Sequence, residues 1–414
     1  MFIKLDVTTR DGKWTYSLYI GGGPISLHVS PQSRKNGITN PSPNSTATPA
    51  MPPPPPPATV LVTNGTVSPQ APPSAASFLD STPGAYTTAR ATAAGGLLWW
   101  PRHLLRLADS TRLLARFHPH LLGLAAPPSR KPFEDSLRGI EPLVNRSVRV
   151  ALDEMPGEDM ALTALLRASP AEEESELEVC VHLGAYVPPV FGEAGARLAV
   201  AGRGRDAAAA KYAPWARMRK SMEKMRPPGV TELLLTNDGD HILEGSITNF
   251  FVVCRREEEH PLNKPLSVEM TANEFEVQTA PLGDGILPGI MRQIVIEVCH
   301  DIGIPFREVS PSWSKHKLWE EAFVTSSLRL IQHVETVQAP ILWENIESKT
   351  WADVSWEVKQ FQGAGSITTQ IKREISKRAI QEEYDIKDLF LQYCSDKPQV
   401  CAVIYFMLLR LLAT

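Results

Sequence analysis

A lysine and a glutamate, Lys211 and Glu244, are the residues whose types and spacing point most directly to chemistry. The sequence between them predicts a β-hairpin, because the β-rich residues 231–235 precede an Asn-Asp-Gly turn and a second strand that leads into Glu244. A lysine amine can form an imine with the aldehyde of pyridoxal phosphate, and a rigidly held carboxylate can keep the pyridine nitrogen protonated. The pair therefore predicts pyridoxal phosphate chemistry, although unrelated lysines and glutamates stand near hairpins in many proteins.

The residues around this pair carry a family resemblance. Lys211 is followed by the triplet Glu232-Leu233-Leu234 and then by an E-G-x-x-x-N element at residues 244–249. This order resembles the class IV aminotransferases, the fold-type IV pyridoxal phosphate enzymes. That family includes branched-chain aminotransferases, D-amino acid aminotransferases and aminodeoxychorismate lyase. The resemblance implies that Lys211 is the catalytic lysine and that Glu244 binds the cofactor at its ring nitrogen.

The resemblance continues upstream of the lysine. Residues 83–91, PGAYTTARA, precede an expected helix at residues 99–114 that contains the family's H-x-x-R-L element, with Arg106 as its arginine. By this resemblance Arg106 binds the cofactor phosphate, a role that suits a guanidinium because it donates two parallel hydrogen bonds to an anion. Tyr86 falls where family members place an aromatic residue beside cofactor and substrate, so it is expected to contact the substrate.

Two further segments downstream match the family. The sequence L-P-G-I-M-R at residues 287–292 places a glycine turn before an amphipathic helix expected from residue 290 to 299. Free amides at a helix N-terminus bind phosphate well, so Ile290 and Met291 are expected to bind the cofactor through their backbones. The apolar segment that starts at Glu320 ends in a T-S-S sequence that resembles the family's phosphate-binding loop. Ser326 and Ser327 are the matching positions.

The resemblance also predicts the architecture, an α+β fold of two domains with the cofactor in the cleft between them. We expect a small α/β domain at residues 58–195 and a larger, β-barrel-like cofactor-binding domain with helices at residues 200–385. The proline-rich residues 1–57 are expected to form a disordered extension outside the catalytic fold, and residues 386–414 an atypical apolar tail. Within the small domain, alternating apolar residues predict strands at residues 147–154 and 177–188.

Composition narrows the class of protein. The 414-residue chain is long enough for two domains, and its net charge of −4 with scattered basic residues argues against a nucleic-acid-binding protein. No metal-ligand cluster stands out among the histidines, so no metal is expected. One local basic run is expected to form the solvated face of a helix; its members are Arg217, Arg219, Lys220, Lys224 and Arg226.

The ends of the chain bear on its location. The uninterrupted apolar run at residues 400–409 is far shorter than the roughly 20 residues that a membrane-spanning helix needs, so a membrane anchor is not expected. The N-terminal region has no apolar core of a secretory signal, and Asp6 and Asp11 are unusual for a transit peptide. We expect a cytoplasmic protein, with a plastid as the alternative.

Three functions remain open at this point. A transaminase that exchanges amino groups between amino acids and 2-oxo acids is favoured. The sequence TTAR at residues 87–90 resembles the strand of aminodeoxychorismate lyase, which releases pyruvate, whereas residues 182–189 lack the R-x-H carboxylate trap of D-amino acid enzymes. A catalytically quiet relative that binds the cofactor without turnover is the third possibility. The resemblance implies a homodimer with small-molecule amino acid or oxo acid substrates.

Overall fold

A computed structural model of the protein describes residues 3–10, 13–20, 23–28, 59–155, 159–169, 176–256 and 274–385. The chain divides into two units, Met1–Pro54 and Pro55–Thr414. The first unit contains an antiparallel sheet of three strands that the sequence analysis did not foresee: β1 (Ile3–Arg10), β2 (Lys13–Ile20) and β3 (Gly23–His28). The proline run at residues 52–57 and the predicted apolar tail lie outside the described residues. The predicted domain boundaries remain predictions.

The second unit begins with a seven-stranded sheet in which each strand is antiparallel to its neighbours. The strand order is β19-β7-β6-β8-β9-β4-β5. Its strands are β4 (Thr59–Thr63), β5 (Thr66–Val67), β6 (Ala85–Ala91), β7 (Gly96–Leu98), β8 (Met160–Ala168), β9 (Leu177–Ala185) and β19 (Glu383–Asp385). The β4–β5 hairpin turns at Asn64 and Gly65, which both have positive φ angles, as a tight Asn-Gly turn requires.

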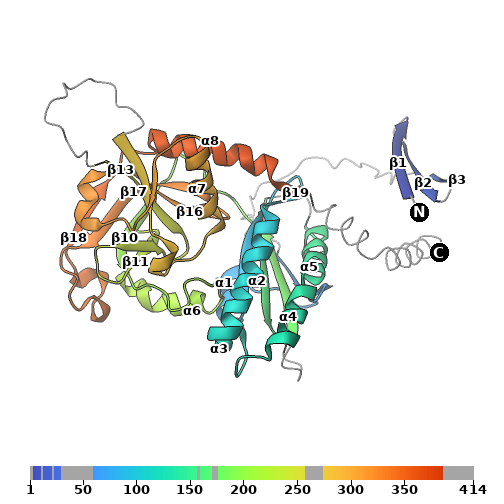
Figure 1. Ribbon diagram of the computed structural model, residues 1–414, viewed down its shortest axis with the longest axis horizontal. Coiled ribbons are helices and arrows are strands. Elements are labelled where there is room, and N and C mark those ends of the chain that lie inside the picture. Colours follow the sequence, from blue (N-terminus) through green and yellow to red (C-terminus); the bar gives the residue numbers. More distant parts are fainter. Residues whose placement is uncertain are drawn as a thin grey trace, which may run out of the picture. The chain divides into compact units, whose positions relative to one another are not determined.

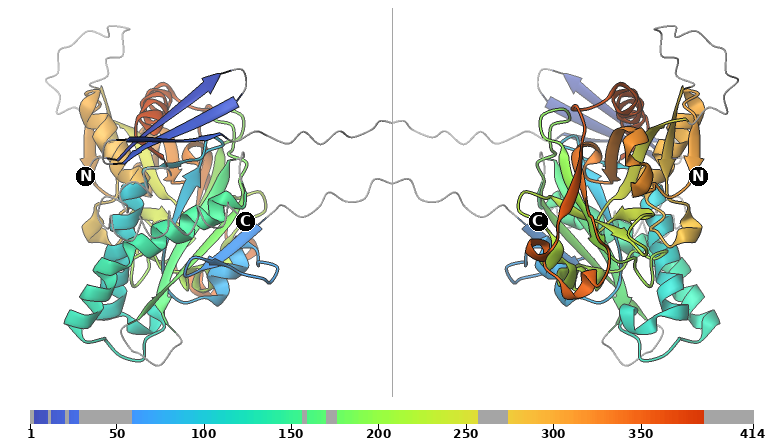
Figure 2. Two further views of the ribbon diagram at one scale, coloured as in Figure 1. Left: turned by 90° about the vertical axis from the view of Figure 1, so that its right-hand side faces the viewer. Right: turned by 90° about the vertical axis from the view of Figure 1, so that its left-hand side faces the viewer.

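Helices cover one face of this sheet: α2 (Trp100–Phe117), α3 (Pro119–Leu122), α4 (Arg130–Gly139) and α5 (Glu141–Asp153). The short helix α1 (Ala75–Ser81) packs through Phe78 on the opposite face. The long helices α2 and α5 pack along the strands (Figures 1 and 2). Side chains of a strand alternate between its two faces. Ala89 and Ala91 of β6 therefore join the core that includes residues of α2 and α5, while Tyr86 packs with Phe78 in a separate cluster.

One predicted strand is wrong. Residues 147–154 belong largely to helix α5, which starts at Glu141 and has a proline in its first turn. Its buried residues are Val144, Ser147, Val148, Ala151 and Leu152, which recur at the three- and four-residue spacing of a helix. The short V-R-V alternation fits a strand equally well, so this window alone could not separate the two. The strand expected at residues 177–188 is present as β9.

A nine-stranded mixed sheet forms the rest of the unit, with the order β12-β11-β10-β17-β16-β13-β14-β15 and β18 beside β17. Its strands are β10 (Ala196–Gly202), β11 (Glu232–Thr236), β12 (Ile242–Gly245), β13 (Asn249–Arg255), β14 (Phe275–Thr279), β15 (Phe306–Glu308), β16 (Trp319–Ser326), β17 (Leu330–Pro340) and β18 (Trp356–Gln360). Helices α6 (Trp215–Met218), α7 (Ile290–Asp301) and α8 (Ser366–Gln381) accompany them. Short 3-10 helices span Arg219–Met225, Leu282–Asp284, Trp313–Leu318, Ile346–Ser348 and Trp351–Asp353.

Two elements in this part confirm predictions that matter for the site. The hairpin before Glu244 exists as β11–β12, with Leu235 opposite Glu244. The helix expected to begin at Ile290 is α7. Helix α8 leads back to β19, whose pairing with β7 ties the end of the described chain to the first sheet (Figure 1). In the part of the chain that the structure describes, no helix is both long enough and apolar enough to span a membrane.

Candidate active site

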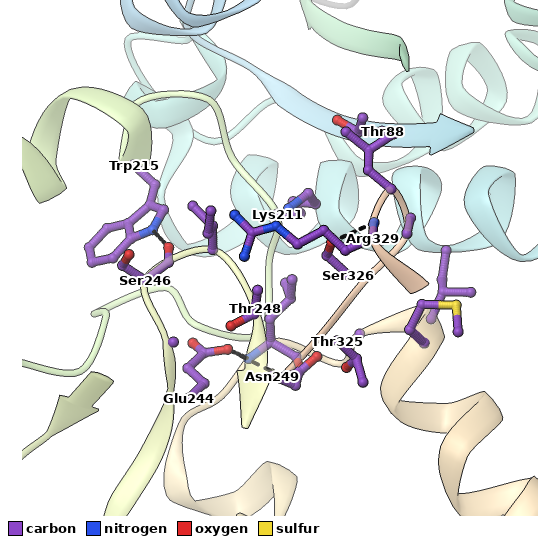
Figure 3. Close-up of a pocket in the computed structure, with 18 of the residues that line it drawn as sticks. Thr88, Lys211, Trp215, Glu244, Ser246, Thr248, Asn249, Thr325, Ser326 and Arg329 are labelled. Atoms are coloured by element: carbon purple, nitrogen blue, oxygen red, sulfur yellow. Dashed lines mark hydrogen bonds between the residues drawn. The ribbon is translucent and has the colours of Figure 1, made fainter. Parts of the chain in front are cut away.

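All the residues predicted to be functional line one cavity of about 320 Å³. They are Tyr86, Arg106, Lys211, Glu244, Ile290, Met291, Ser326 and Ser327. Figure 3 shows that side chains from well-separated parts of the sequence, among them Lys211, Glu244 and Ser326, surround this space. The lining residues come from both sheets of the second unit, so only the folded chain assembles the cavity.

Lys211 is held by its backbone. Its amide donates to Ser110 Oγ of α2 over 3.0 Å, and its carbonyl accepts from the Tyr86 amide of β6 over 2.9 Å. The Nζ atom lies 4.7 Å from the centroid of the Tyr86 ring. Burial, and then the charges of Arg106 and Arg205, lower the pKa of Lys211, while Tyr86 acts in the opposite direction. The lysine is therefore set up to release its proton more readily than a solvated amine.

Glu244 is buried on β12 and fixed from both sides. Its Oε1 accepts from Arg205 Nη2 at 2.6 Å and Nε at 3.0 Å, and its Oε2 accepts from the Leu287 amide at 3.1 Å. The side chains of Arg205 and Glu244 are 5% and 3% exposed. Burial raises the pKa of Glu244, and the guanidinium of Arg205 counteracts this by stabilising the ionised form. The carboxylate is thus paired and held in one orientation.

Arg205 was missed by the sequence analysis. It lies in the Gly- and Ala-rich connection after β10, where an isolated arginine has no pattern that would distinguish it from a surface residue. Its importance comes from the buried partner Glu244 and from the Trp215 ring, whose centroid is 5.4 Å from the guanidinium carbon. Sequence spacing gives no signal for either contact.

The second carboxylate of the hairpin, Glu232, has a different environment. Its Oε1 accepts from the amides of Ile247 and Thr248 at 2.8 and 3.0 Å, and its Oε2 from Arg329 Nη1 at 3.2 Å. A Cβ on Gly245 would lie 2.3 Å from the same Oε1, so this close approach requires glycine. Glu232 therefore shapes the loop after β12 and holds Arg329.

Arg106 projects from α2 toward the cavity and is almost fully buried. Its Nη2 donates to Thr87 Oγ1 at 2.8 Å, and the same hydroxyl lies 2.7 Å from His103 Nδ1. Because Thr87 Oγ1 accepts from Arg106, its own proton is available to His103 Nδ1, and burial lowers the pKa of His103. Burial lowers the pKa of Arg106 to about 10. Among the described residues, Arg106 Nε is buried without a hydrogen-bond partner.

The N-terminus of α7 faces the same cavity. Gly289 precedes its first residue Ile290, and no side chain caps the helix. A Cβ on Gly289 would lie 1.9 Å from Asn249 Oδ1, so the helix can begin this close to β13 only with glycine. Thr325 Oγ1, at the end of β16, is buried without a partner among the described residues. Free helix amides, a guanidinium and hydroxyls together suit a phosphate monoester.

One basic residue departs from its prediction. Arg219 was expected on the solvated face of a helix, but it lines the cavity and is half-buried. The chain forms α6 and then a 3-10 helix instead of one regular helix, and Trp215 of α6 donates to the Ser246 carbonyl at 2.7 Å. This bond ties the basic segment to the cavity loop, so Arg219 is turned inward while Arg217 remains exposed.

Comparisons with known proteins identify the family and the fold. The family described as amino-transferase class IV matches residues 84–337. No curated protein matches the sequence. The protein is similar to the branched-chain aminotransferase from Thermoproteus uzoniensis solved with norvaline, with 19% identity, 78% of this chain and 95% of that chain covered, and a TM-score of 0.53.

Two other solved structures have the same fold. A hypothetical aminotransferase from Mycobacterium tuberculosis, in its apo form, is 16% identical, with 80% of this chain and 100% of that chain covered and a TM-score of 0.50. A fold IV-transaminase from Curtobacterium pusillum is 15% identical, with 78% of this chain and 99% of that chain covered and a TM-score of 0.50. These similarities confirm the two-domain α+β fold. Because the family match spans more than half of the chain, the protein belongs to the class IV aminotransferases, whose cofactor is pyridoxal 5′-phosphate.

Proposed function

We propose that this protein is an amino acid transaminase, which transfers an amino group between an amino acid and a 2-oxo acid. The observation that carries the proposal is the cavity that joins a half-buried lysine of lowered pKa, a buried carboxylate and a group of phosphate-binding donors. A site with these three parts suits the binding and use of pyridoxal phosphate. Membership of the family supports the same reaction class.

In this proposal, different residues of the cavity bind different parts of the cofactor. Arg106 and the amides of Ile290 and Met291 bind the phosphate, together with the hydroxyls of Ser326 and Ser327. The buried Arg106 Nε without a partner is a donor that a phosphate oxygen would satisfy. Glu244 would bind the cofactor at its ring nitrogen. When bound, pyridoxal phosphate supplies an electron sink that stabilises negative charge at the substrate Cα.

The side chains of Lys211 and Glu244 are proposed to hold or transfer protons. Lys211 would hold the cofactor aldehyde through its amine, and the free amine would move the proton at the substrate Cα. Its lowered pKa makes the neutral form accessible for this task. Glu244 holds a proton on the ring nitrogen, and Arg205 keeps that carboxylate ionised and oriented. Tyr86, beside Lys211 Nζ, contacts the substrate.

A lyase that releases pyruvate from aminodeoxychorismate is the second candidate, because residues 87–90 resemble the strand of that enzyme. The same lysine and carboxylate serve both reactions. In the structure, however, Thr87 is hydrogen-bonded to Arg106 and His103. It therefore supports the arginine that is proposed to bind the cofactor phosphate, and both reactions would need that arginine. This contact serves both reactions, so it gives no support to the lyase over the transaminase, which we continue to favour.

A substrate screen separates these functions. The purified protein with pyridoxal phosphate is incubated with amino acids of both configurations and with several 2-oxo acids, and the new amino acid and oxo acid are measured by chromatography. We expect exchange that requires an added oxo acid. Pyruvate formed from aminodeoxychorismate without an acceptor would establish the lyase instead. Cofactor absorbance without turnover of any substrate would establish a quiet relative.

The assembly and location are further proposals. The family resemblance supports a homodimer, and we place the protein in the cytoplasm, with a plastid as the alternative. Light scattering on the purified protein measures the assembly, and a fluorescent fusion reports the compartment. A monomer that retains full activity would contradict the proposed dimer.

Replacing Arg106 with Ala should weaken the retention of pyridoxal phosphate. The substitution removes a charge-assisted hydrogen bond to phosphate, which contributes about 1.5–3 kcal/mol, so the cofactor dissociation constant should rise about ten- to hundred-fold. Equilibrium dialysis measures this constant. Arg116→Ala, at an exposed position of the same helix, is the matched control. Equal cofactor affinity in Arg106→Ala and the control would mean that the phosphate lies elsewhere.

The attachment of the cofactor should depend on pH in a defined direction. Only the neutral lysine amine is nucleophilic, and burial lowers the pKa of Lys211 below its ordinary value of 10.5. Uptake of pyridoxal phosphate by cofactor-free protein should therefore accelerate as pH rises, and reach its half-maximal rate below pH 10.5. Rapid-mixing absorbance measurements give this profile. A half-maximum at or above the ordinary value would show that the amine is solvated.

A further inference from the structure

The cavity carries more positive charge than its known partners can neutralise. Its cationic side chains are Arg106, Arg205, Lys211, Arg219 and Arg329, and the carboxylate among its lining residues is Glu244. Arg205 is paired with Glu244, and Arg329 is paired with Glu232, which does not itself line the cavity. In the proposed function, Arg106 meets the cofactor phosphate and Lys211 attaches the cofactor. Among the described residues, no anion is paired with the remaining cation, Arg219.

Arg219 lacks an ion-pair partner in the described part of the chain. No carboxylate of the described residues lies within 4.0 Å of its guanidinium, although its neighbour Lys220 is paired with Asp80 of α1 at 3.0 Å. The guanidinium is also only half-buried, so it can remain charged without a partner. A cation that is kept unpaired at the wall of a cavity is available to an anionic ligand.

The segment that carries Arg219 is fixed at both ends. On one side, Trp215 Nε1 donates to the Ser246 carbonyl at 2.7 Å, which ties α6 to the loop after Glu244. On the other side, the Lys220–Asp80 pair ties the chain to α1. Burial raises the pKa of Tyr86, but nearby charges, first Lys211 and then Arg219, lower it overall. Arg219 also lines the same cavity as Tyr86 and Lys211.

We infer that Arg219 binds the carboxylate of the substrate and so makes the enzyme selective for amino acids over simple amines. This inference rests on the proposed function. A guanidinium recognises a carboxylate through two parallel hydrogen bonds. The substrate Cα must lie within reach of Lys211, and Arg219 lines the same cavity as Tyr86, whose ring centroid Lys211 Nζ approaches to 4.7 Å. A carboxylate on that carbon can thus meet Arg219, while residues 182–189 contain no arginine that could do so.

The test uses a carboxylate that cannot react. The full chain loaded with pyridoxal phosphate is titrated with 3-phenylpropionate, which has no amine, and with its neutral analogue 3-phenylpropionamide, and heats of binding are measured. The unaltered protein should bind the carboxylate more tightly than the amide. Arg219→Gln should weaken carboxylate binding about ten- to hundred-fold and leave amide binding unchanged. Arg219→Lys should recover part of the loss, because a lysine keeps the charge but not the paired geometry.

Arg217→Gln is the matched control, because Arg217 belongs to the same basic segment but is exposed and does not line the cavity. The assignment of Arg219 is overturned if the unaltered protein does not prefer the carboxylate, if Arg219→Gln binds it normally, or if the control loses as much affinity. Borohydride reduction of every sample reports the cofactor linkage. Its absence in the unaltered protein would reject the proposed function itself, whereas an intact linkage with carboxylate binding independent of Arg219 would reject this inference alone.

Discussion

Replacing Lys211 with Ala should abolish the covalent attachment of pyridoxal phosphate that borohydride makes permanent. The lining residues of the cavity include no second lysine, and the attachment needs a primary amine. Turnover should fall by at least about 10²–10⁴-fold, because the same amine carries the proton of the reaction. Mass spectrometry of peptides after reduction identifies the labelled residue.

The variant should still fold, which makes this result interpretable. The contacts that fix residue 211 to Ser110 and to Tyr86 are made by its backbone, so alanine can keep them. Removing the buried amine also removes a group that burial destabilises in its charged form. Lys224→Ala is the control, since Lys224 is exposed and does not line the cavity. A reduced adduct found on Lys220 or Lys224 in the unaltered protein would show that the assignment of Lys211 is wrong.

Local patterns allowed part of the site to be predicted from the sequence. The β11–β12 hairpin and the glycine before α7 are encoded by neighbouring residues, so they could be recognised without the fold. Arg205 and Arg219 could not be predicted, because their importance depends on contacts with Glu244 and with the cavity that form only in the folded chain. The strand expected at residues 147–154 failed because a few alternating residues fit one side of a helix equally well.

The roles of the two glutamates of the hairpin also depend on contacts that form only in the folded chain. From the sequence, Glu232 and Glu244 are both acids beside apolar strand residues, and Glu244 was favoured by its place after the hairpin and by the family resemblance. The structure gives them different surroundings. Glu244 lines the cavity and is paired with Arg205, whereas Glu232 is surrounded by loop amides and Arg329 and does not line the cavity. This difference permits a matched pair of substitutions.

Replacing Glu244 with Gln should reduce turnover by orders of magnitude while the cofactor stays attached. An ionised carboxylate beside the ring nitrogen raises the pKa of that nitrogen, and a neutral amide cannot do so. Attachment through Lys211 takes place at a different atom of the cofactor and should survive. Some loss of stability is also expected, because Arg205 would keep its buried charge without the counter-charge it now has at 2.6 Å. Turnover is therefore measured per cofactor-loaded molecule, at a temperature below the unfolding transition of the variant.

Glu232→Gln provides the comparison that assigns the role. An amide in place of the Glu232 carboxylate keeps the size of the side chain but removes the charge that Arg329 and the loop amides now meet. We expect it to lower the melting temperature, while turnover per loaded molecule stays within about tenfold of the unaltered protein, because its effect on the ring nitrogen is indirect. Near-normal turnover in Glu244→Gln together with collapse of turnover in stable, loaded Glu232→Gln would reverse the two roles. The ring nitrogen would then lie against Glu232, and the Arg205–Glu244 pair would be a structural feature of the cavity wall.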